Sequence, residues 1–172
     1  MELTDWIGRI RSWLWRSSEG RNRESSVNRW TREPLDEERV ASLRRLEDDL
    51  GYRFHHIQWL DQALTHKSFT HESSPLQPVP PGGNGNEVLE FLGDAVLSLA
   101  VTSLLLEEFP EAHEGILSKR RSHLVKRKFL AHLSRELRLE KYLLLGKGEL
   151  RDGGRKKTSI LENTYEALVG AI

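Results

Sequence analysis

Cysteine is absent from the 172-residue sequence, which excludes disulfide bonds and thiolate metal sites. The histidines occur at no zinc-binding spacing, and no HExxH pattern is present. The N-terminus contains no apolar core of the kind found in secretory signals. We therefore expect a cytoplasmic protein in which any metal site depends on oxygen ligands.

Strand patterns and nucleotide-binding loops are also scarce. Almost no segment alternates apolar and polar residues with period two, so we predict an all-α fold. The order GxxxxGK[ST] does not occur, which excludes a P-loop NTPase. A composition of 37% hydrophobic and 30% charged residues is typical of one soluble domain with a modest core.

Two regions are expected outside the helical core. Residues 1–33 predict an N-terminal amphipathic helix, carrying Trp6 and Trp13 on its apolar stripe, followed by a flexible linker. The helix could contact a membrane surface, a partner protein or its own domain, and the sequence leaves these alternatives open. The domain itself is expected at residues 34–172. Within it, residues 72–86 contain four prolines and three glycines and predict a loop.

Three carboxylates interrupt the apolar run at residues 86–100. Glu87, Glu90 and Asp94 fall within an arc of roughly 60° on one helix face, because a helix advances about 100° per residue. Acids on one face are most often a solvated surface, and a membrane span is the other simple reading. Glu90 and Asp94 are the only charged residues between positions 88 and 106, which favours a buried metal site over either alternative.

A second polar cluster lies in the last predicted helix, residues 158–172. Glu162, Asn163 and Glu166 stand there among apolar residues, and Asn163 and Glu166 share a face. Two buried helices that each present oxygen ligands can together bind a hard cation such as Mg²⁺.

Charge is strongly segregated although the net charge is zero. Residues 33–114 hold 16 acidic and 5 basic side chains, whereas residues 115–160 hold 14 basic and 4 acidic ones. A basic helix is expected from Glu114 onward, and the glycine-rich segment 146–157 is expected to offer its backbone to phosphates. A basic run is often only a solvated face, but an acidic region for metal beside a basic one for a polyanion suits a nuclease.

Three motifs resemble one known family. They are NEVLEFLGDAVL at residues 86–97, ALTHKSF at residues 63–69 and SILENTYEALVGAI at residues 159–172. In order and spacing they are similar to the endonuclease domain of ribonuclease III, and the resemblance runs from about residue 36 to the end. It implies a helical endonuclease domain that acts as a homodimer.

The resemblance also implies the chemistry. It predicts a Mg²⁺-dependent endoribonuclease, with Mn²⁺ as a substitute, that cuts double-stranded RNA in rRNA and mRNA processing and leaves 5′-phosphate and 3′-hydroxyl ends. Carried over by motif position, the roles are metal binding for Glu90, Asp94, Asn163 and Glu166, catalysis for Asp94 and Glu166, auxiliary acids for Glu87 and Glu114, and insertion into the partner subunit for Phe91.

Recognition of an A-form duplex is expected to depend on shape and on phosphate contacts. The candidate contacts are all basic and lie in the segment 119–157: Lys119, Arg120, Lys126, Arg127, Lys147, Arg151, Arg155, Lys156 and Lys157.

The chain departs from the family pattern in two places. Asn163 stands where an aspartate is common, so one formal negative charge is missing from the predicted cluster. The sequence also stops six residues after Glu166, where the family continues, so we expect a truncated piece without the double-stranded RNA-binding domain. A catalytically weak RNA-binding or dimerisation module is therefore the alternative to an active nuclease.

Overall fold

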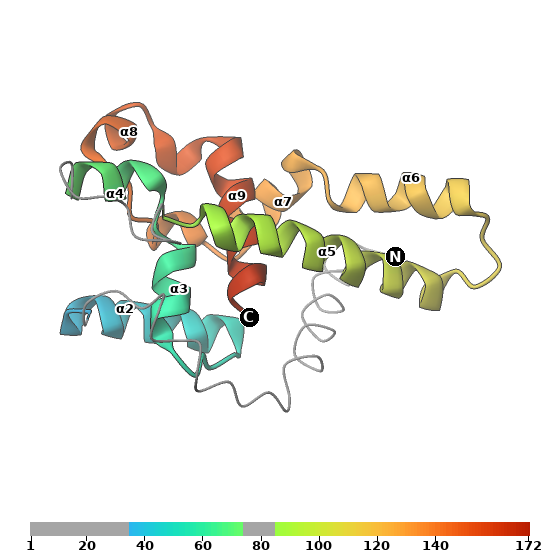
Figure 1. Ribbon diagram of the computed structural model, residues 1–172, viewed down its shortest axis with the longest axis horizontal. Helices are drawn as coiled ribbons and strands as arrows, with labels where there is room; N and C mark the ends of the chain where they lie inside the picture. Colours follow the sequence, from blue (N-terminus) through green and yellow to red (C-terminus); the bar gives the residue numbers. More distant parts are fainter. Residues whose placement is uncertain (1–34, 74–84) are drawn as a thin grey trace.

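The structure, a computed structural model, describes residues 35–73 and 85–172. Its elements, in chain order, are α2 Glu37–Leu50, α3 Ile57–Ala63, α4 Lys67–Ser73, α5 Glu87–Glu108, α6 Glu114–Leu124, α7 Arg127–Glu136, η2 Leu139–Lys141, α8 Lys147–Arg151, η3 Gly154–Lys156 and α9 Thr158–Ala171 (Figure 1). No strand occurs in these ranges, which confirms the all-α prediction. The predicted N-terminal helix and linker, and most of the loop at 72–86, lie outside the described residues.

Helix α5 crosses α9 at the centre of the molecule (Figure 1). Leu97, Val101 and Leu104 of α5 are buried in the main core, together with Tyr165 and Leu168 of α9. By length and composition α5 could span a bilayer. Its contacts with α9 and α6 account for the buried part of its apolar surface, whereas Phe91, Leu92 and Leu99 are exposed.

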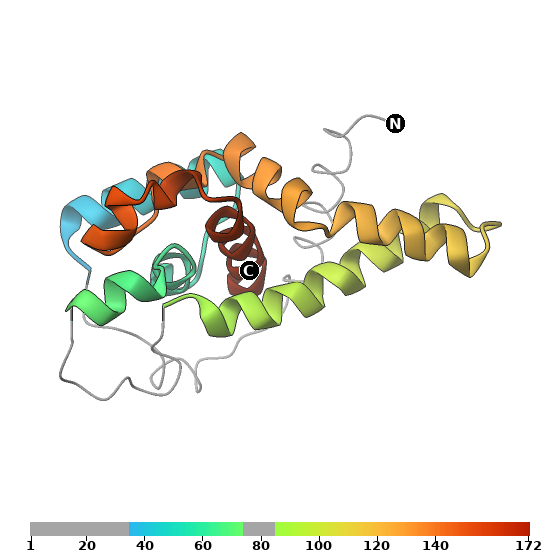
Figure 2. The same ribbon diagram turned by 90° about the horizontal axis from the view of Figure 1, so that it is seen from above.

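The second half of α5 forms a projecting arm with α6, which runs back alongside it (Figure 2). None of the residues of α6 is buried, and Ile116 is 48% exposed because none of the described elements forms a third layer over this arm. The predicted basic helix from Glu114 is in fact two helices. They are separated at Val125 and Lys126, where α7 turns back to pack on α9.

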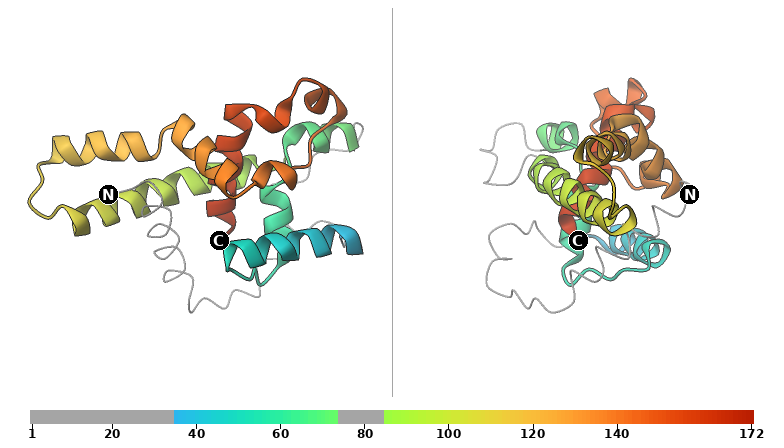
Figure 3. Two further views of the ribbon diagram at one scale, coloured as in Figure 1. Left: turned by 180° about the vertical axis from the view of Figure 1, so that it is seen from behind. Right: turned by 90° about the vertical axis from the view of Figure 1, so that its right-hand side faces the viewer.

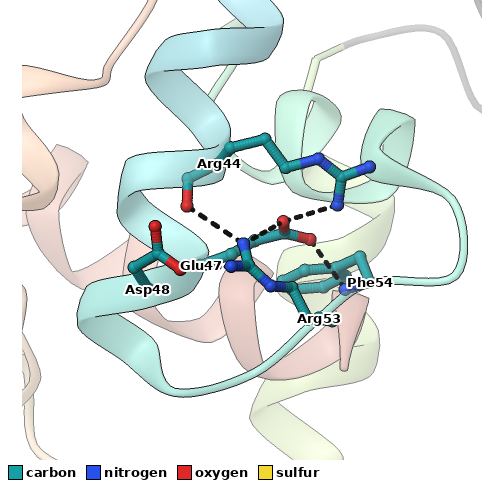
Figure 4. Close-up of polar contacts among 5 residues, drawn as sticks. All are labelled: Arg44, Glu47, Asp48, Arg53 and Phe54. Carbon is teal, nitrogen blue, oxygen red and sulfur yellow. Dashed lines mark hydrogen bonds and ion pairs between the residues drawn. The ribbon is translucent and has the colours of Figure 1, made fainter.

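Helix α2 begins at the cap residue Asp36 and ends at Gly51, which adopts the left-handed conformation (φ 66°). A buried carboxylate attaches the following turn to this helix (Figure 4). Glu47 Oε1 accepts a hydrogen bond of 2.8 Å from the backbone N–H of Phe54, and Glu47 Oε2 lies 2.7 Å from Arg44 Nη1 and 3.1 Å from Arg53 Nη1. The chain ends near this turn (Figure 3), where the Tyr52 hydroxyl donates to the carbonyl of Ile172 at 3.4 Å.

Helices α3 and α4 are separated by a short extended segment. Thr65 pairs with Leu144 as an isolated bridge, because Leu144 N donates to Leu64 O and His66 N donates to Leu144 O. This bridge ends α3 and starts α4 at Lys67. It thereby fixes the beginning of α4 beside the N-terminal end of α5.

Candidate functional site

Two glycines let α5 and α9 cross with their backbones in contact. A Cβ atom on Gly93 would lie 1.7 Å from the carbonyl oxygen of Glu166, and one on Gly170 would lie 2.1 Å from the carbonyl oxygen of Leu89. Real Cβ atoms essentially never approach another atom within 3.0 Å, so no other residue fits without movement. The crossing therefore presses the first turns of α5 against the second half of α9.

Carboxylates gather at this crossing. Glu90 and Asp94 lie one turn apart on α5, on either side of Gly93, while α9 contributes Glu166. Glu166 is only 9% exposed, Glu90 is half-buried and Asp94 is exposed. Burial, together with the charges of Glu162, Asp94 and Glu90, raises the pKa of Glu166 to about 7, although the charge of Arg127 lowers it. A cation bound near such acids would favour their charged forms.

Asn163 also belongs to the cluster. Burial and the charge of Glu87 raise the pKa of Glu90, whereas hydrogen bonding to Asn163 lowers it. Asn163 therefore lies beside Glu90. The structure thus brings together the four residues predicted as the metal cluster, two from each helix.

The donor atoms at this cluster are chemically suited to a hard divalent cation, because all of them are carboxylate or amide oxygens. Within the ranges that the structure describes, no three carboxylate or histidine side chains already converge as an ion site. Asp94 is exposed and can rotate toward Glu90 and Glu166 without disturbing the core. The residue types on the two crossing helices are therefore those that would hold such an ion.

Two grooves in the described surface lie elsewhere. A groove of about 470 Å³ and another of about 300 Å³ are on the α5–α6 arm. Glu90, Asp94 and Glu166 line neither of them. The acidic cluster is thus not enclosed by either groove, an arrangement that suits a polymer lying across the surface.

Two ion pairs border the acidic cluster. Lys67 Nζ lies 2.9 Å from Glu87 Oε1, and Arg127 Nε lies 2.5 Å from Glu162 Oε2. Sequence reasoning missed both pairs, because their partners are 20 and 35 residues apart and share no helical spacing. The available signals were weak: Lys67 lies within the ALTHKSF motif, and Glu162 precedes Glu166 by one helical turn.

The predicted auxiliary residues separate in space. Glu87 borders the cluster, but Glu114 begins α6 and lines a groove with Thr102 and Leu106. Thr102 is eight residues beyond Asp94, about 12 Å along the helix, so Glu114 does not join the cluster within one chain. Phe91 is 82% exposed.

The predicted RNA contacts are distributed over several elements. Lys119 and Arg120 are exposed on the arm, where Arg120 lies 4.1 Å above the ring of Phe109. Lys126 and Arg127 lie at the start of α7. The other candidates lie on α8 or between α8 and α9: Lys147, Arg151, Arg155, Lys156 and Lys157. Of these, Arg155 donates to the carbonyl of Glu140 and Lys157 pairs with Glu149.

The glycine-rich segment 146–157 differs from its prediction. It contains α8 and η3, and its backbone is already occupied by a carboxylate of this chain. The N–H groups of Lys147 and Gly148 donate to Glu72 at 2.8 and 3.3 Å. These hydrogen bonds lower the pKa of Glu72. The expectation that these amides bind phosphate is therefore wrong for this conformation.

Comparison with known proteins gives a consistent family. A family model described as ribonuclease-III-like matches residues 57–172. Proteins named ribonuclease 3 from Oleidesulfovibrio alaskensis and Pseudomonas putida (strain GB-1) are 48% and 47% identical to this chain over 130 and 133 residues. These matches cover 76% and 77% of this chain, and 54% and 53% of the relatives. The chain thus spans about half the length of the curated relatives it matches.

The fold has a solved counterpart. The nuclease domain of ribonuclease III from Campylobacter jejuni, described for structural flexibility in a region involved in dimer formation, is 41% identical with a TM-score of 0.67. The match covers 76% of this chain and 83% of that domain. A family model that spans most of the chain and a helical fold shared at this identity agree: the chain belongs to the ribonuclease III-like family.

Proposed function

We propose that this chain is the nuclease domain of a Mg²⁺-dependent endoribonuclease that cuts double-stranded RNA and leaves 5′-phosphate and 3′-hydroxyl ends. The observation that carries the proposal is that Glu90, Asp94 and Glu166 lie at the crossing of two helices, where burial and the charges of Glu162, Asp94 and Glu90 raise the pKa of Glu166 to about 7. The proposal includes a cytoplasmic role in the processing of rRNA and mRNA precursors.

The four clustered residues have distinct tasks in this proposal. Glu90, Asp94, Glu166 and the amide oxygen of Asn163 would hold Mg²⁺, for which Mn²⁺ could substitute. The chemistry supplied by such an ion is activation of the attacking water and stabilisation of charge on the leaving oxygen. Glu166 would give up its proton when the ion binds, since a carboxyl group must be ionised to act as a ligand. Asp94 and Glu166 would then orient the attacking water.

Cutting requires the duplex to lie across the open acidic surface. The exposed cations on α6, α7 and α8 would contact its phosphates, because an A-form duplex offers phosphates and 2′-hydroxyl groups rather than readable base edges. Recognition would then depend mainly on shape and would weaken as salt is added.

A homodimer is part of the proposal. The face of α5 that carries Val88, Phe91, Leu92 and Leu99 is exposed and apolar, and such a patch is typical of an interaction surface. If Phe91 inserts into the partner subunit, a symmetric dimer buries two copies of this side chain, one from each subunit. At about 2 kcal/mol for each buried aromatic ring, Phe91→Ala should raise the dimer dissociation constant by about 10³-fold.

Light scattering over a concentration series measures this effect. Leu150→Ala is the matched control, since Leu150 is an exposed apolar residue on α8. An unchanged molecular mass for Phe91→Ala at every concentration would remove Phe91 from the interface.

A cleavage assay tests the proposed activity. A long RNA duplex is incubated with the chain in Mg²⁺ and then in Ca²⁺, with duplex binding measured in parallel. Glu166→Gln should slow cutting by about 10²-fold or more, as expected when one charge-stabilising group is removed from an active site. Glu107→Gln, an exposed acid at the other end of α5, is the control and should cut normally.

Asn163 favours a second candidate function. An amide in place of the family's common aspartate weakens the charge of the cluster, so the chain could be a catalytically weak RNA-binding or dimerisation module. Intact duplex binding without cutting in either metal would support this alternative. Cutting in Mg²⁺ that depends on Glu166 would exclude it.

A further inference from the structure

The two helices of the acidic cluster repeat one arrangement. On α5, Glu87 stands one turn before Glu90 and pairs with Lys67. On α9, Glu162 stands one turn before Glu166 and pairs with Arg127. Each helix therefore presents an inner acid at the crossing and an outer acid that holds a cation from another helix.

Both cations are exposed. The side chains of Lys67 and its partner Glu87 are 51% and 40% exposed, and ion pairs between exposed groups contribute only about 0–1 kcal/mol. The side chain of Arg127 is 66% exposed, although that of its partner Glu162 is only 13% exposed. Each residue is also the first of its helix, α4 or α7. A cation there opposes the helix dipole instead of stabilising the helix. Neither cation is therefore placed where it would contribute much to the stability of the fold.

Both pairs nevertheless act on the cluster. Burial chiefly raises the pKa of Glu90; the charges of Glu87 and Glu162 raise it as well, and the charge of Lys67 lowers it. In the same way, the charge of Arg127 lowers the pKa of Glu166. In Figure 1, α4 and α7 lie on either side of α9. The outer acids Glu87 and Glu162, which hold the two cations, lie one helical turn, about 5 Å along the helix, from the inner acids.

We propose that Lys67 is a phosphate-positioning residue, which Glu87 holds ready beside the cluster and which moves to an RNA phosphate next to the one being cut, while Arg127 leaves Glu162 in the same way. This inference rests on the proposed function, because it takes double-stranded RNA as the ligand. A phosphate can displace Glu87 at little cost, since the exposed ion pair is weak. The carboxylates Glu87 and Glu162 act in this arrangement as holders of the two cations.

Duplex binding in Ca²⁺ tests the proposal without requiring catalysis. Fluorescence anisotropy gives the dissociation constant of a labelled RNA duplex for the full chain at a series of salt concentrations. Lys67→Gln should weaken binding several-fold at low salt and should reduce the slope of log affinity against log salt by about 1, the value for one lost phosphate contact. Lys67→Arg should restore both. Adding Arg127→Gln to Lys67→Gln should reduce the slope by about 1 again.

Arg45→Gln is the matched control, because Arg45 is an exposed cation on α2, which contributes no residue to the cluster. Its slope should equal that of the wild type. A wild-type slope in Lys67→Gln, with an unchanged melting temperature, would overturn the proposal, since the loss of a phosphate contact must change this slope. A wild type that binds the duplex but fails to cut it in Mg²⁺ would instead refute the proposed hydrolysis, and the binding slopes would still decide the role of Lys67.

Discussion

The crossing of α5 and α9 predicts an unusually large effect for the smallest possible substitution, Gly93→Ala. The added Cβ would lie 1.7 Å from the carbonyl oxygen of Glu166 and 2.5 Å from its carbonyl carbon. Both atoms belong to helix backbone, which cannot rotate away as a side chain can. Ordinary contact begins at 3.4 Å, so the helices must separate by about 1.7 Å at this point.

This separation should affect stability and activity together. Overpacking of a well-packed interface destabilises by about 1–3 kcal/mol, and a backbone clash should reach the upper end of that range. The helix propensity of alanine returns about 1 kcal/mol, so a net loss of about 2 kcal/mol is expected. Activity should fall further, by about 10²-fold, because a displacement of 1 Å between catalytic groups has this effect. Glu90 and Asp94 would move with α5, away from Glu166.

Urea unfolding and RNA cleavage measure the two effects, with cleavage assayed at a temperature where the variant is folded. Gly115→Ala is the control: a Cβ on Gly115 meets nothing within 4 Å, so this variant should be at least as stable as the wild type and equally active. Gly170→Ala should behave like Gly93→Ala, since its Cβ meets the same crossing from the other side. Wild-type stability and activity in Gly93→Ala would refute the account of the crossing.

Three further predictions follow from charge. The pKa of Glu166 is raised from 4.5 to about 7, chiefly by burial. Without metal, its contribution to stability is therefore present below pH 4.5 and is lost, by up to about 3 kcal/mol, as the pH rises through 7. Unfolding at several pH values should show this loss in the wild type and not in Glu166→Gln, and equal profiles would contradict it. Asn163→Asp restores a negative charge and should lower the Mg²⁺ concentration needed for cleavage; a variant that needs no less Mg²⁺ would refute this. Burial opposes ionisation of Glu47, but hydrogen bonds from Phe54, Arg44 and Arg53 lower its pKa overall, so its contribution to the free energy of unfolding is present above pH 4.5 and is lost in acid. Glu47→Ala should destabilise the fold by about 2–3 kcal/mol in urea unfolding at neutral pH. The control Asp48→Ala removes an exposed ion pair and should change stability by at most about 1 kcal/mol.

The halves of the acidic cluster could be predicted from sequence because helical periodicity reports which residues share a face. Glu90 and Asp94 on one apolar helix, and Asn163 and Glu166 on another, were identified in this way, and the structure places them together. Periodicity does not report the distance between two helices. The sequence does not show that α9 crosses α5 at Gly93, where the lack of a side chain permits the contact that forms the cluster.

Contacts between distant segments and the positions of helix breaks were less predictable. The basic region reads as one continuous pattern, but α6 lies against α5 while α7 lies against α9, so the chain must bend at residues 125–126. Glu72 is an ordinary loop acid in the sequence, yet it accepts the amides of the glycine-rich segment 75 residues later. Such partners depend on the completed fold and leave no local signal.

The ion pairs also change how the charge of the cluster is understood. From sequence, Asn163 removes one negative charge, but Glu162, the residue before it, acts on both Glu90 and Glu166. In the free chain Arg127 offsets that charge. In the proposed mechanism an RNA phosphate would draw Arg127 away, which would uncover the carboxylate of Glu162 next to the proposed metal ligands, and the phosphate would add its own charge. Substrate binding should therefore strengthen cation binding, and by linkage the cation should strengthen substrate binding. A cluster that is weak by itself would in this way acquire its full charge only when the duplex is in place.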